Sequence, residues 1–359
     1  MNKDPFKEYI KESEPEKRDK GYAWHTAIGL QAVDGLKTSQ YLVDTAIRNI
    51  EGDISIDEAS ELLNSYYEEN PKTENDDRTE EADKVALRIA KILSEKAFSF
   101  TPNEYISIHK KLFVGIYKHA GKIRDYNITK KEWVLNGATV MYGSASELRT
   151  TLDYDFSEEK KFSYKNLSMD GIIHHLAVFV SRLWQIHIFA EGNTRTTAVF
   201  FIKYLRTLGF DATNDIFAEN AWYFRNSLVR ANYNNLRNGV HETTEYLELF
   251  LRNLLLEEKN ELHNRSMHIS GSLKADIENT KADIEKILTN IDDVIENKTV
   301  MHVTALYEEC GRNNVFGRSG VERITGLKST RASEIIKLML ENDVIEPVRG
   351  QGKGKYRFK

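Results

Sequence analysis

The chain has 359 residues, of which 40% are hydrophobic and 10% aromatic, a composition typical of a globular protein with a sizeable core. No apolar run reaches the length of a membrane span, and the charged start lacks the apolar segment of a secretory signal. The single cysteine, Cys310, excludes an internal disulfide framework. We therefore expect a cytoplasmic location and a packing role for this residue.

The formal net charge of -5 is unevenly distributed along the chain. Residues 300–359 carry eleven Lys and Arg against seven Asp and Glu, a net charge of +4, which leaves -9 for the remainder. The C-terminal segment is therefore the better candidate for binding a polyanion.

The N-terminal part predicts a small helical module at residues 1–75. Helical periodicity covers residues 22–70, and Ser55 with Glu58 three residues later has the capping-box pattern of a helix start. The polar, acidic stretch at residues 68–84 that follows is typical of a linker.

A central block at residues 84–256 contains the longest helical patterns, for example residues 83–98 and 171–186. With only five prolines in the chain, these patterns predict a mostly α fold. One segment differs, because strand-like residues flank the pair Asn136 and Gly137 and predict a β-hairpin.

Residues 257–299 are charged, with isoleucines at helical spacing, and predict a helical linker or a partner-binding helix, of which we favour the linker. Residues 300–359 predict three short helices and then two strands joined by a glycine-rich, basic tip. Ser329 or Thr330 is the expected cap of the third helix. The isoleucines of the linker are Ile277, Ile284, Ile287, Ile291 and Ile295.

The stretch from His187 to Asn193 must connect the helix at residues 171–186 to the next one. Gly192 and Asn193 tolerate the left-handed backbone that a tight helix entry needs. The amides of residues 193–195 would then point out of a helix N-terminus, and with the Arg195 side chain they form a phosphate-binding site.

Two side chains in this loop predict catalysis. His187 is the candidate general base toward a hydroxyl, because the unperturbed pKa of a histidine lies near neutrality. Glu191 offers hard oxygen ligands beside the amides and suits a Mg²⁺ ion that bridges two phosphates. Phe189, between them, is expected to point inward and hold the loop. Each residue alone has an ordinary structural explanation, and their order makes the pattern specific.

This loop resembles the signature of the Fic family, H-P-F-x-[D/E]-G-N-G-R-x-x-R. His187, Phe189, Glu191, Gly192, Asn193 and Arg195 carry the match. The resemblance extends over residues 84–256: the segment "AGKIRDYNI" is similar to the one before the Fic flap, and the hairpin at Asn136 and Gly137 stands where the flap is expected. "YFRNSLVRANY" resembles the helix that contacts the adenine end of the nucleotide, with Tyr223 as the candidate.

The resemblance implies a nucleotidyltransferase that uses ATP and Mg²⁺ to transfer AMP to a Tyr, Thr or Ser hydroxyl of a protein target. His187 would take the proton of the hydroxyl, and Glu191 would hold the metal. Asn193, Thr194 and Arg195 would neutralise the pyrophosphate side, while the flap would align the target as an added strand.

Three positions depart from the signature. Ile188 replaces proline and Thr194 replaces glycine, and neither change removes a reactive group. Ala198 stands where a second arginine of the family binds the outer phosphates, which puts the mode of ATP binding in doubt. Lys203 and Arg206 on the following helix are candidates to compensate.

The N-terminal module resembles the antitoxin-like unit that blocks the ATP site in some Fic proteins, where a glutamate pairs with the second arginine. Asp34, followed by Gly35, is the best match to that glutamate, and Glu51 is the alternative. Because Ala198 removes the arginine, this inhibitory salt bridge is not expected. A plain packing subdomain is an equal alternative.

The last sixty residues resemble a winged helix-turn-helix, which implies DNA binding through a recognition helix and a basic wing, although winged helices also bind proteins. A DNA-binding regulator that senses a nucleotide with little catalysis, or an enzyme that removes AMP, are the alternatives to an adenylyltransferase. Winged-helix regulators often dimerise, so a homodimer is an alternative to a monomer. The DNA-contact candidates are Arg331 and Lys337 on the third helix and Arg349, Lys353 and Lys355 on the wing.

Overall fold

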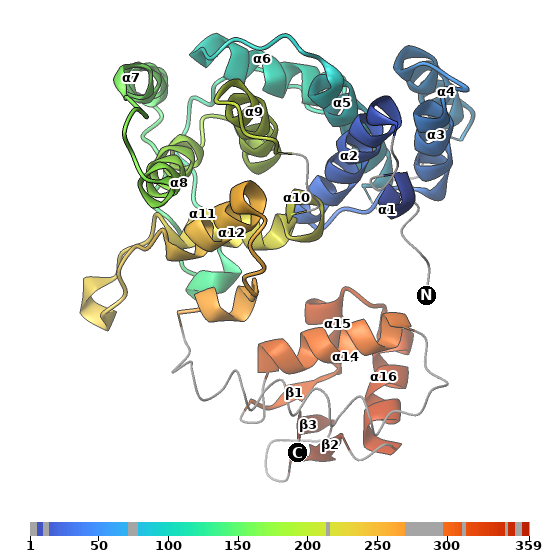
Figure 1. Ribbon diagram of the computed structural model, residues 1–359. Coiled ribbons are helices and arrows are strands. Elements are labelled where there is room, and N and C mark those ends of the chain that lie inside the picture. The colour runs from blue at the N-terminus through green and yellow to red at the C-terminus, as the bar shows by residue number, and fades with distance from the viewer. Residues whose placement is uncertain are drawn as a thin grey trace. The chain divides into compact units, whose positions relative to one another are not determined.

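The computed structural model describes residues 6–9, 14–70, 78–212, 216–269, 297–310, 314–341, 344–348 and 354–358. The chain divides into two compact units, Met1–Ile269 and Ser270–Lys359, which are treated separately below (Figure 1). The described part of each unit has its own hydrophobic core. No described helix has both the length and the apolar character that crossing a membrane requires.

All named secondary-structure elements among the described residues of the first unit are helices. Helices α8, α9, α11 and α12 pack together, while α6 and α5 cover the other side of α9 (Figure 1). Its α-helices are α1 Phe6–Tyr9, α2 Pro15–Gly29, α3 Gln40–Glu51, α4 Ile56–Glu69, α5 Thr79–Ser94, α6 Pro102–Phe113, α7 Leu148–Lys161, α8 Met169–Ile186, α9 Asn193–Thr207, α10 Ile216–Glu219, α11 Ala221–Arg230 and α12 Glu245–Leu256. Single 3₁₀ segments are η1 Leu30–Asp34, η2 Trp133–Leu135, η3 Leu236–Asn238 and η4 Asn264–Met267.

The N-terminal helices share one core with the central block, because α2 packs along α5 (Figure 1). A buried carboxylate joins the two parts: Asp83 on α5 accepts hydrogen bonds from the Ser39 backbone N–H at 2.8 Å and from the Tyr67 hydroxyl at 2.6 Å. Burying a carboxylate is costly unless it is hydrogen-bonded, so these bonds fix α3 and α4 against α5.

Of the two helix caps predicted from the sequence, one is confirmed, and the helix expected to follow Ser329 or Thr330 already begins at Ser329. The capping box at Ser55 and Glu58 is confirmed, with both reciprocal hydrogen bonds at the start of α4. Helix α5 begins at Thr79, inside the stretch expected as a linker, because Glu80 and Glu81 there suit the positive end of a helix. The linker isoleucines, and the rest of residues 270–296, lie outside the described residues.

The segment expected as a β-hairpin differs from that prediction. Residues 128–143 contain the 3₁₀ turn η2 and no assigned strand. Asn136 does adopt the left-handed conformation, with φ of 52°, and the loop is closed by the Glu132 N–H donating to Ala138 O at 2.9 Å. Val134 and Leu135, adjacent in sequence, are both buried. An alternating strand with one exposed face would have left one of them in solvent, which explains the difference.

The described residues of the second unit form three helices and a small antiparallel sheet in the order β1-β3-β2. The predicted helices and the last two strands are confirmed, and the sequence missed the two-residue strand β1. Cys310 lies in this core, as expected, and burial raises the pKa of its thiol to about 11. The elements are α14 Asn297–Cys310, β1 Phe316–Gly317, α15 Arg318–Thr325, α16 Ser329–Glu341, β2 Ile345–Pro347 and β3 Lys355–Phe358.

Candidate active site

The loop that joins α8 to α9 uses left-handed backbone at both of its ends. His187 is the C-cap of α8 with φ of 49°, and Gly192 is the N-cap of α9 with φ of 75°. A Cβ on Gly192 would lie 2.4 Å from the Phe113 ring, so the position needs glycine for its conformation and for its space. The helix–loop–helix arrangement predicted from the sequence is confirmed.

Asn193 locks the inside of this loop. Its Oδ1 accepts from the Phe189 N–H at 3.0 Å, and its Nδ2 donates to Phe189 O at 2.8 Å. The Thr196 N–H reaches back to Gly192 O at 3.1 Å. The N–H groups of residues 193–195, in the first turn of α9, have no intrahelical acceptor, so they offer donors to an anion.

His187 is buried and lies against two aromatic rings. Its Nδ1 lies 3.3 Å from Trp184 O, and its ring centroid is 4.4 Å from that of Tyr142. With a proton on Nδ1 toward this carbonyl, Nε2 carries the free lone pair. Burial, and then the charge of Lys130, lowers the pKa of His187 well below its ordinary value. The ring is therefore neutral at pH 7, as a general base must be before it accepts a proton.

Glu191 is held through its backbone while its side chain remains exposed. The carboxylate Oε2 lies 3.2 Å from Lys130 Nζ, and the side chain is 55% exposed. Glu191 O accepts a hydrogen bond from His109 Nε2 at 3.0 Å, because His109 Nδ1 accepts from the Gly121 N–H and the ring proton must be on Nε2. The His109 ring also stacks on Phe189, with centroids 3.7 Å apart.

The donor set around the loop fits Mg²⁺ better than a metal that requires a protein cage. Among the described residues, no group of three or more His, Cys, Asp and Glu side chains could hold a metal ion. Mg²⁺ is usually bound by one or two carboxylates together with substrate phosphates and water. Glu191 is such a carboxylate, beside a helix N-terminus that suits phosphate.

Arg195 is fully buried and already has acidic partners. Its guanidinium lies 4.9 Å from the Phe113 ring centroid. Nε lies 2.8 Å from Asp34 Oδ2, Nη1 donates to Gln31 Oε1 at 3.0 Å, and Nη2 donates to Glu81 Oε1 at 2.8 Å and to the Tyr117 hydroxyl at 3.2 Å.

Glu81, the other acidic partner of Arg195, also interacts with the side chains of Tyr117 and Arg78. The Tyr117 hydroxyl donates to its Oε1 at 2.6 Å, and Arg78 Nη2 lies 2.7 Å from the same oxygen. Burial alone would raise the pKa of Glu81, but hydrogen bonds from Tyr117 and Arg195 lower the pKa below its ordinary value. Glu81 is therefore ionised at neutral pH and holds Arg195 in place.

The structure brings Asp34, and not Glu51, to the loop. Asp34 ends η1, and the left-handed Gly35 with φ of 69° follows it. Its partner is Arg195, the signature arginine that is present. Glu51 lies at the end of α3 and pairs with Lys17 at 2.8 Å. The sequence-based expectation concerned a salt bridge to the second signature arginine, which Ala198 replaces, and did not foresee that Asp34 pairs with Arg195.

Ala198 is fully buried, and neither candidate cation compensates for it. Lys203 Nζ donates to Ile92 O at 3.1 Å, and Arg206 Nη1 donates to Leu93 O at 2.6 Å. Both side chains thus satisfy carbonyls at the C-terminal end of α5, where a helix leaves acceptors without partners.

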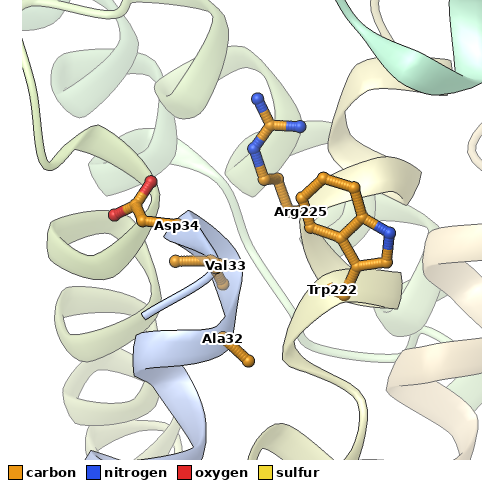
Figure 2. A pocket seen from close by; sticks show the side chains of 6 residues that line it. Ala32, Val33, Asp34, Trp222 and Arg225 are labelled. Atoms are coloured by element: carbon orange, nitrogen blue, oxygen red, sulfur yellow. The ribbon is translucent and has the colours of Figure 1, made fainter. Parts of the chain in front are cut away.

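A pocket of about 450 Å³ opens between η1 and the first turns of α11 (Figure 2). Trp222 is 37% exposed, and the Arg225 guanidinium lies 5.1 Å from the centroid of its indole ring. Tyr223, the predicted adenine contact, is instead buried and donates to Tyr246 O at 3.1 Å. The pocket is lined by Ala32, Val33, Asp34, Gly35, Trp222 and Arg225.

Glu132 connects this pocket to the flap and to His187. Arg225 Nη1 lies 2.7 Å from Glu132 Oε2, and Arg225 Nη2 donates to Oε1 at 3.0 Å. The Tyr142 hydroxyl, whose ring touches His187, donates to the same Oε1 at 3.0 Å. Asn136 and Gly137, at the tip of the flap, are exposed.

Sequence reasoning missed Gln31, Glu81 and Tyr117 around Arg195. Glu81 lies in the acidic stretch that was expected to be a linker, although the amphipathic pattern after it marked a helix start. Tyr117 carried no local signal, because it meets Arg195 only through tertiary packing.

In the second unit, the predicted DNA-contact residues of α16, Arg331 and Lys337, are exposed. Arg331 Nη1 lies 2.8 Å from Glu334 Oε2. Lys355, at the start of β3, is also exposed. The other two candidates, Arg349 and Lys353, lie outside the described residues.

A sequence model of the Fic/DOC family matches residues 99–205, which include α6, α8, the loop and most of α9. Among solved structures, a Fic family protein from Desulfovibrio desulfuricans G20 matches with 12% identity and a TM-score of 0.44, covering 96% of this chain and 88% of that chain. A search of curated proteins found no match. The loop and the helices on both sides of it therefore lie within a segment, residues 99–205, that matches the Fic/DOC family.

Proposed function

We propose that this protein is a protein adenylyltransferase, which transfers AMP from ATP to a Tyr, Thr or Ser hydroxyl of a target protein or of itself. The observation that carries the proposal is the loop between α8 and α9. A buried, neutral histidine lies at one end, and a helix N-terminus with an arginine lies at the other. This arrangement suits deprotonation of a hydroxyl beside a bound phosphate chain.

In the proposed reaction, His187 Nε2 accepts the proton of the target hydroxyl, and the hydroxyl oxygen attacks the α-phosphorus of ATP. The bond from the α-phosphorus to the oxygen shared with the β-phosphate breaks, so pyrophosphate leaves and AMP remains on the target. The amides of residues 193–195 and the Arg195 guanidinium donate hydrogen bonds to the pyrophosphate side.

Mg²⁺, when bound, would supply positive charge to the phosphate oxygens as their charge redistributes. Glu191 is the carboxylate that would hold it, and Lys130 is the partner that Glu191 would give up. The Glu191 backbone stays fixed by His109, so the carboxylate can change partners without movement of the loop.

The pocket lined by Trp222 and Arg225 is proposed to receive the base and ribose of the nucleotide. An exposed indole offers a stacking surface, and the pocket shares Asp34 with the Arg195 cluster. Phosphates that bind Arg195 must displace Asp34 from it. We therefore propose that Asp34 restrains ATP binding in the resting protein.

The test is transfer of label from ATP labelled at the α-phosphate, in the presence of Mg²⁺, to the protein itself and to a cell lysate. We expect His187→Ala to lose transfer. His174→Ala is the matched control, because His174 lies on the same helix, is exposed and pairs with Glu248. Equal labelling by the parent and His187→Ala would contradict the base role.

Two alternatives have different outcomes in this assay. Label that appears and then disappears after ATP is removed indicates an enzyme that removes AMP. Nucleotide binding without any transfer, in the parent protein and in the Asp34→Ala variant, indicates a nucleotide sensor. The second outcome would contradict the proposed transfer reaction.

DNA binding is proposed as a second function of the C-terminal unit. Its element order and its three-stranded sheet suit a winged helix, and α16 exposes Arg331 and Lys337. If these residues contact phosphates, the double variant Arg331→Ala, Lys337→Ala should bind DNA more weakly and with a shallower salt dependence. Lys165→Ala, an exposed lysine of the first unit, is the control. Binding that is insensitive to salt would contradict the proposal.

A further inference from the structure

Arg124, in the segment before the flap, is buried and surrounded by backbone carbonyls. Its backbone N–H also donates to Ile188 O at 2.9 Å. In the part of the chain that the structure describes, no ion pair joins Arg124 to a carboxylate. Its guanidinium donates to His187 O at 2.7 Å, Tyr126 O at 2.6 Å, Gly143 O at 2.6 Å and Ile186 O at 3.3 Å.

These carbonyls explain why a cation is buried here. The last carbonyls of a helix have no intrahelical donor, and the C-terminal end of a helix is partially negative. Ile186 ends α8, and His187 follows it in a left-handed conformation that is uncommon for a residue with a Cβ. Arg124 supplies both the donors and the positive charge that stabilise this ending, and so fixes the backbone of His187.

The same guanidinium also fixes the flap relative to His187. Besides the bond from Arg124 to Gly143 O, the Gly143 N–H donates to Gln185 O at 3.3 Å. A Cβ on Gly143 would lie 2.9 Å from Ile186 O, so the flap approaches the end of α8 as closely as a glycine allows.

We infer that Arg124 is a positioning residue, which sets the distance and orientation of the His187 ring relative to a target hydroxyl held by the flap. The inference rests on the proposed transfer reaction. A general base must lie within hydrogen-bonding reach of the proton it takes, and a displacement of about 1 Å costs up to roughly 100-fold in rate. Arg124 touches neither the nucleotide pocket nor Arg195, so its loss should affect the chemical step and not nucleotide binding.

The experiment compares Arg124→Ala with Arg206→Ala. Arg206 is the matched control because it also donates to a carbonyl at a helix end, Leu93 O, away from the loop. We expect Arg124→Ala to lower kcat about 10- to 100-fold with little change in the Kd for ATP, and millimolar guanidinium to restore part of the rate. Arg206→Ala should keep its kcat. An equal loss of kcat in both variants, or a loss of ATP affinity in Arg124→Ala without loss of kcat, would overturn the inference.

Hydrogen–deuterium exchange gives a readout that does not depend on activity. In Arg124→Ala, amides of residues 187–189 and 141–143 should exchange faster, while the amides of α9 keep their rates. If Arg124→Ala does not fold, Gly143→Ala disturbs the same junction from the flap side and should give the same pattern. Unchanged exchange at both segments would overturn the positioning role. Absence of labelling by the parent protein would contradict only the proposed reaction.

Discussion

Replacement of Asp34 by asparagine should make ATP bind more tightly while making the protein less stable. The Arg195 guanidinium is fully buried, and Asp34, which is 28% exposed, is one of its two acidic partners. Asp34 Oδ2 and Arg195 Nε form an ion pair at 2.8 Å without hydrogen-bond geometry. This partly buried pair should contribute about 1.5–3 kcal/mol, between an exposed and a fully buried pair, and Asp34→Asn removes its negative charge without emptying the position. Arg195 keeps Glu81, so the variant does not leave a buried charge without any carboxylate.

The affinity for ATP should rise and the stability of the protein should fall, and both changes have the same cause. ATP phosphates no longer compete with the full charge of Asp34, so the Kd for ATP should fall by roughly 10- to 100-fold, which corresponds to about 1.5–3 kcal/mol. The free energy of unfolding without nucleotide should fall by a similar amount. Calorimetric titration with ATP and Mg²⁺ measures the first quantity, and urea denaturation measures the second.

Glu51→Gln is the control, because Glu51 was the other inhibitory candidate and pairs with Lys17 at the surface. It should change neither quantity measurably, since exposed ion pairs contribute little. If Asp34→Asn lowers stability but leaves the Kd for ATP unchanged, then Asp34 only packs the N-terminal helices against the core, and the competition argument is refuted.

Three further predictions concern other parts of the site. Gly192→Ala should abolish labelling and lower the free energy of unfolding by about 1–3 kcal/mol in urea denaturation, because its φ of 75° is strained for alanine and its Cβ would meet Phe113 at 2.4 Å. Trp222→Ala should weaken ATP binding by about 1–3 kcal/mol in calorimetry, whereas Tyr223→Phe should affect only stability. If ATP binding instead depends on Tyr223 and not on Trp222, the adenine base contacts Tyr223. Burial lowers the pKa of His109 to about 4, so between that pH and its unfolded value near 6.5 the unfolded chain binds the extra proton. Stability should therefore fall as the pH is lowered, by about 2 kcal/mol between pH 7 and pH 5 from His109 alone, and His109→Gln should reduce this slope in urea melts measured at both pH values.

The sequence predicted those features that depend on neighbouring residues. The loop between two helices follows from apolar periodicity on both sides and from Gly192, and the capping box at Ser55 follows from Glu58 three residues later. The flap was not predicted correctly, because an Asn-Gly pair fixes a turn but does not decide whether its arms pair as strands. The burial of both Val134 and Leu135 was decided by packing.

Residues that meet across the fold could not be predicted in the same way. Glu81 is 114 residues from Arg195 along the chain, and nothing in its neighbourhood marks it as the partner of a buried cation. The same holds for Trp222 and Tyr223, which are adjacent: one lines the pocket and the other lies in the core. The orientation of α11 about its own axis, where it packs against α12 and η1, decides which of the two side chains lines the pocket.

The pairing of Asp34 with Arg195 also changes what the loss of the second arginine means. With Ala198 in its place, the proposed function requires one guanidinium to pair with Asp34 and with the phosphates in turn. Any substitution that strengthens the hold of Asp34 or Glu81 on Arg195 should therefore weaken ATP binding by the same free energy, since both compete for the same donors. The prediction follows for Tyr117→Phe, which removes a hydroxyl that donates to Glu81 at 2.6 Å and leaves that carboxylate more available to Arg195. The substitution also removes the neutral acceptor that this hydroxyl offers to Arg195 Nη2 at 3.2 Å, but a bond to a neutral group contributes less than the gain at the carboxylate. ATP should bind more weakly to this variant, and an unchanged or lower Kd would show that the two ligands do not share one arginine.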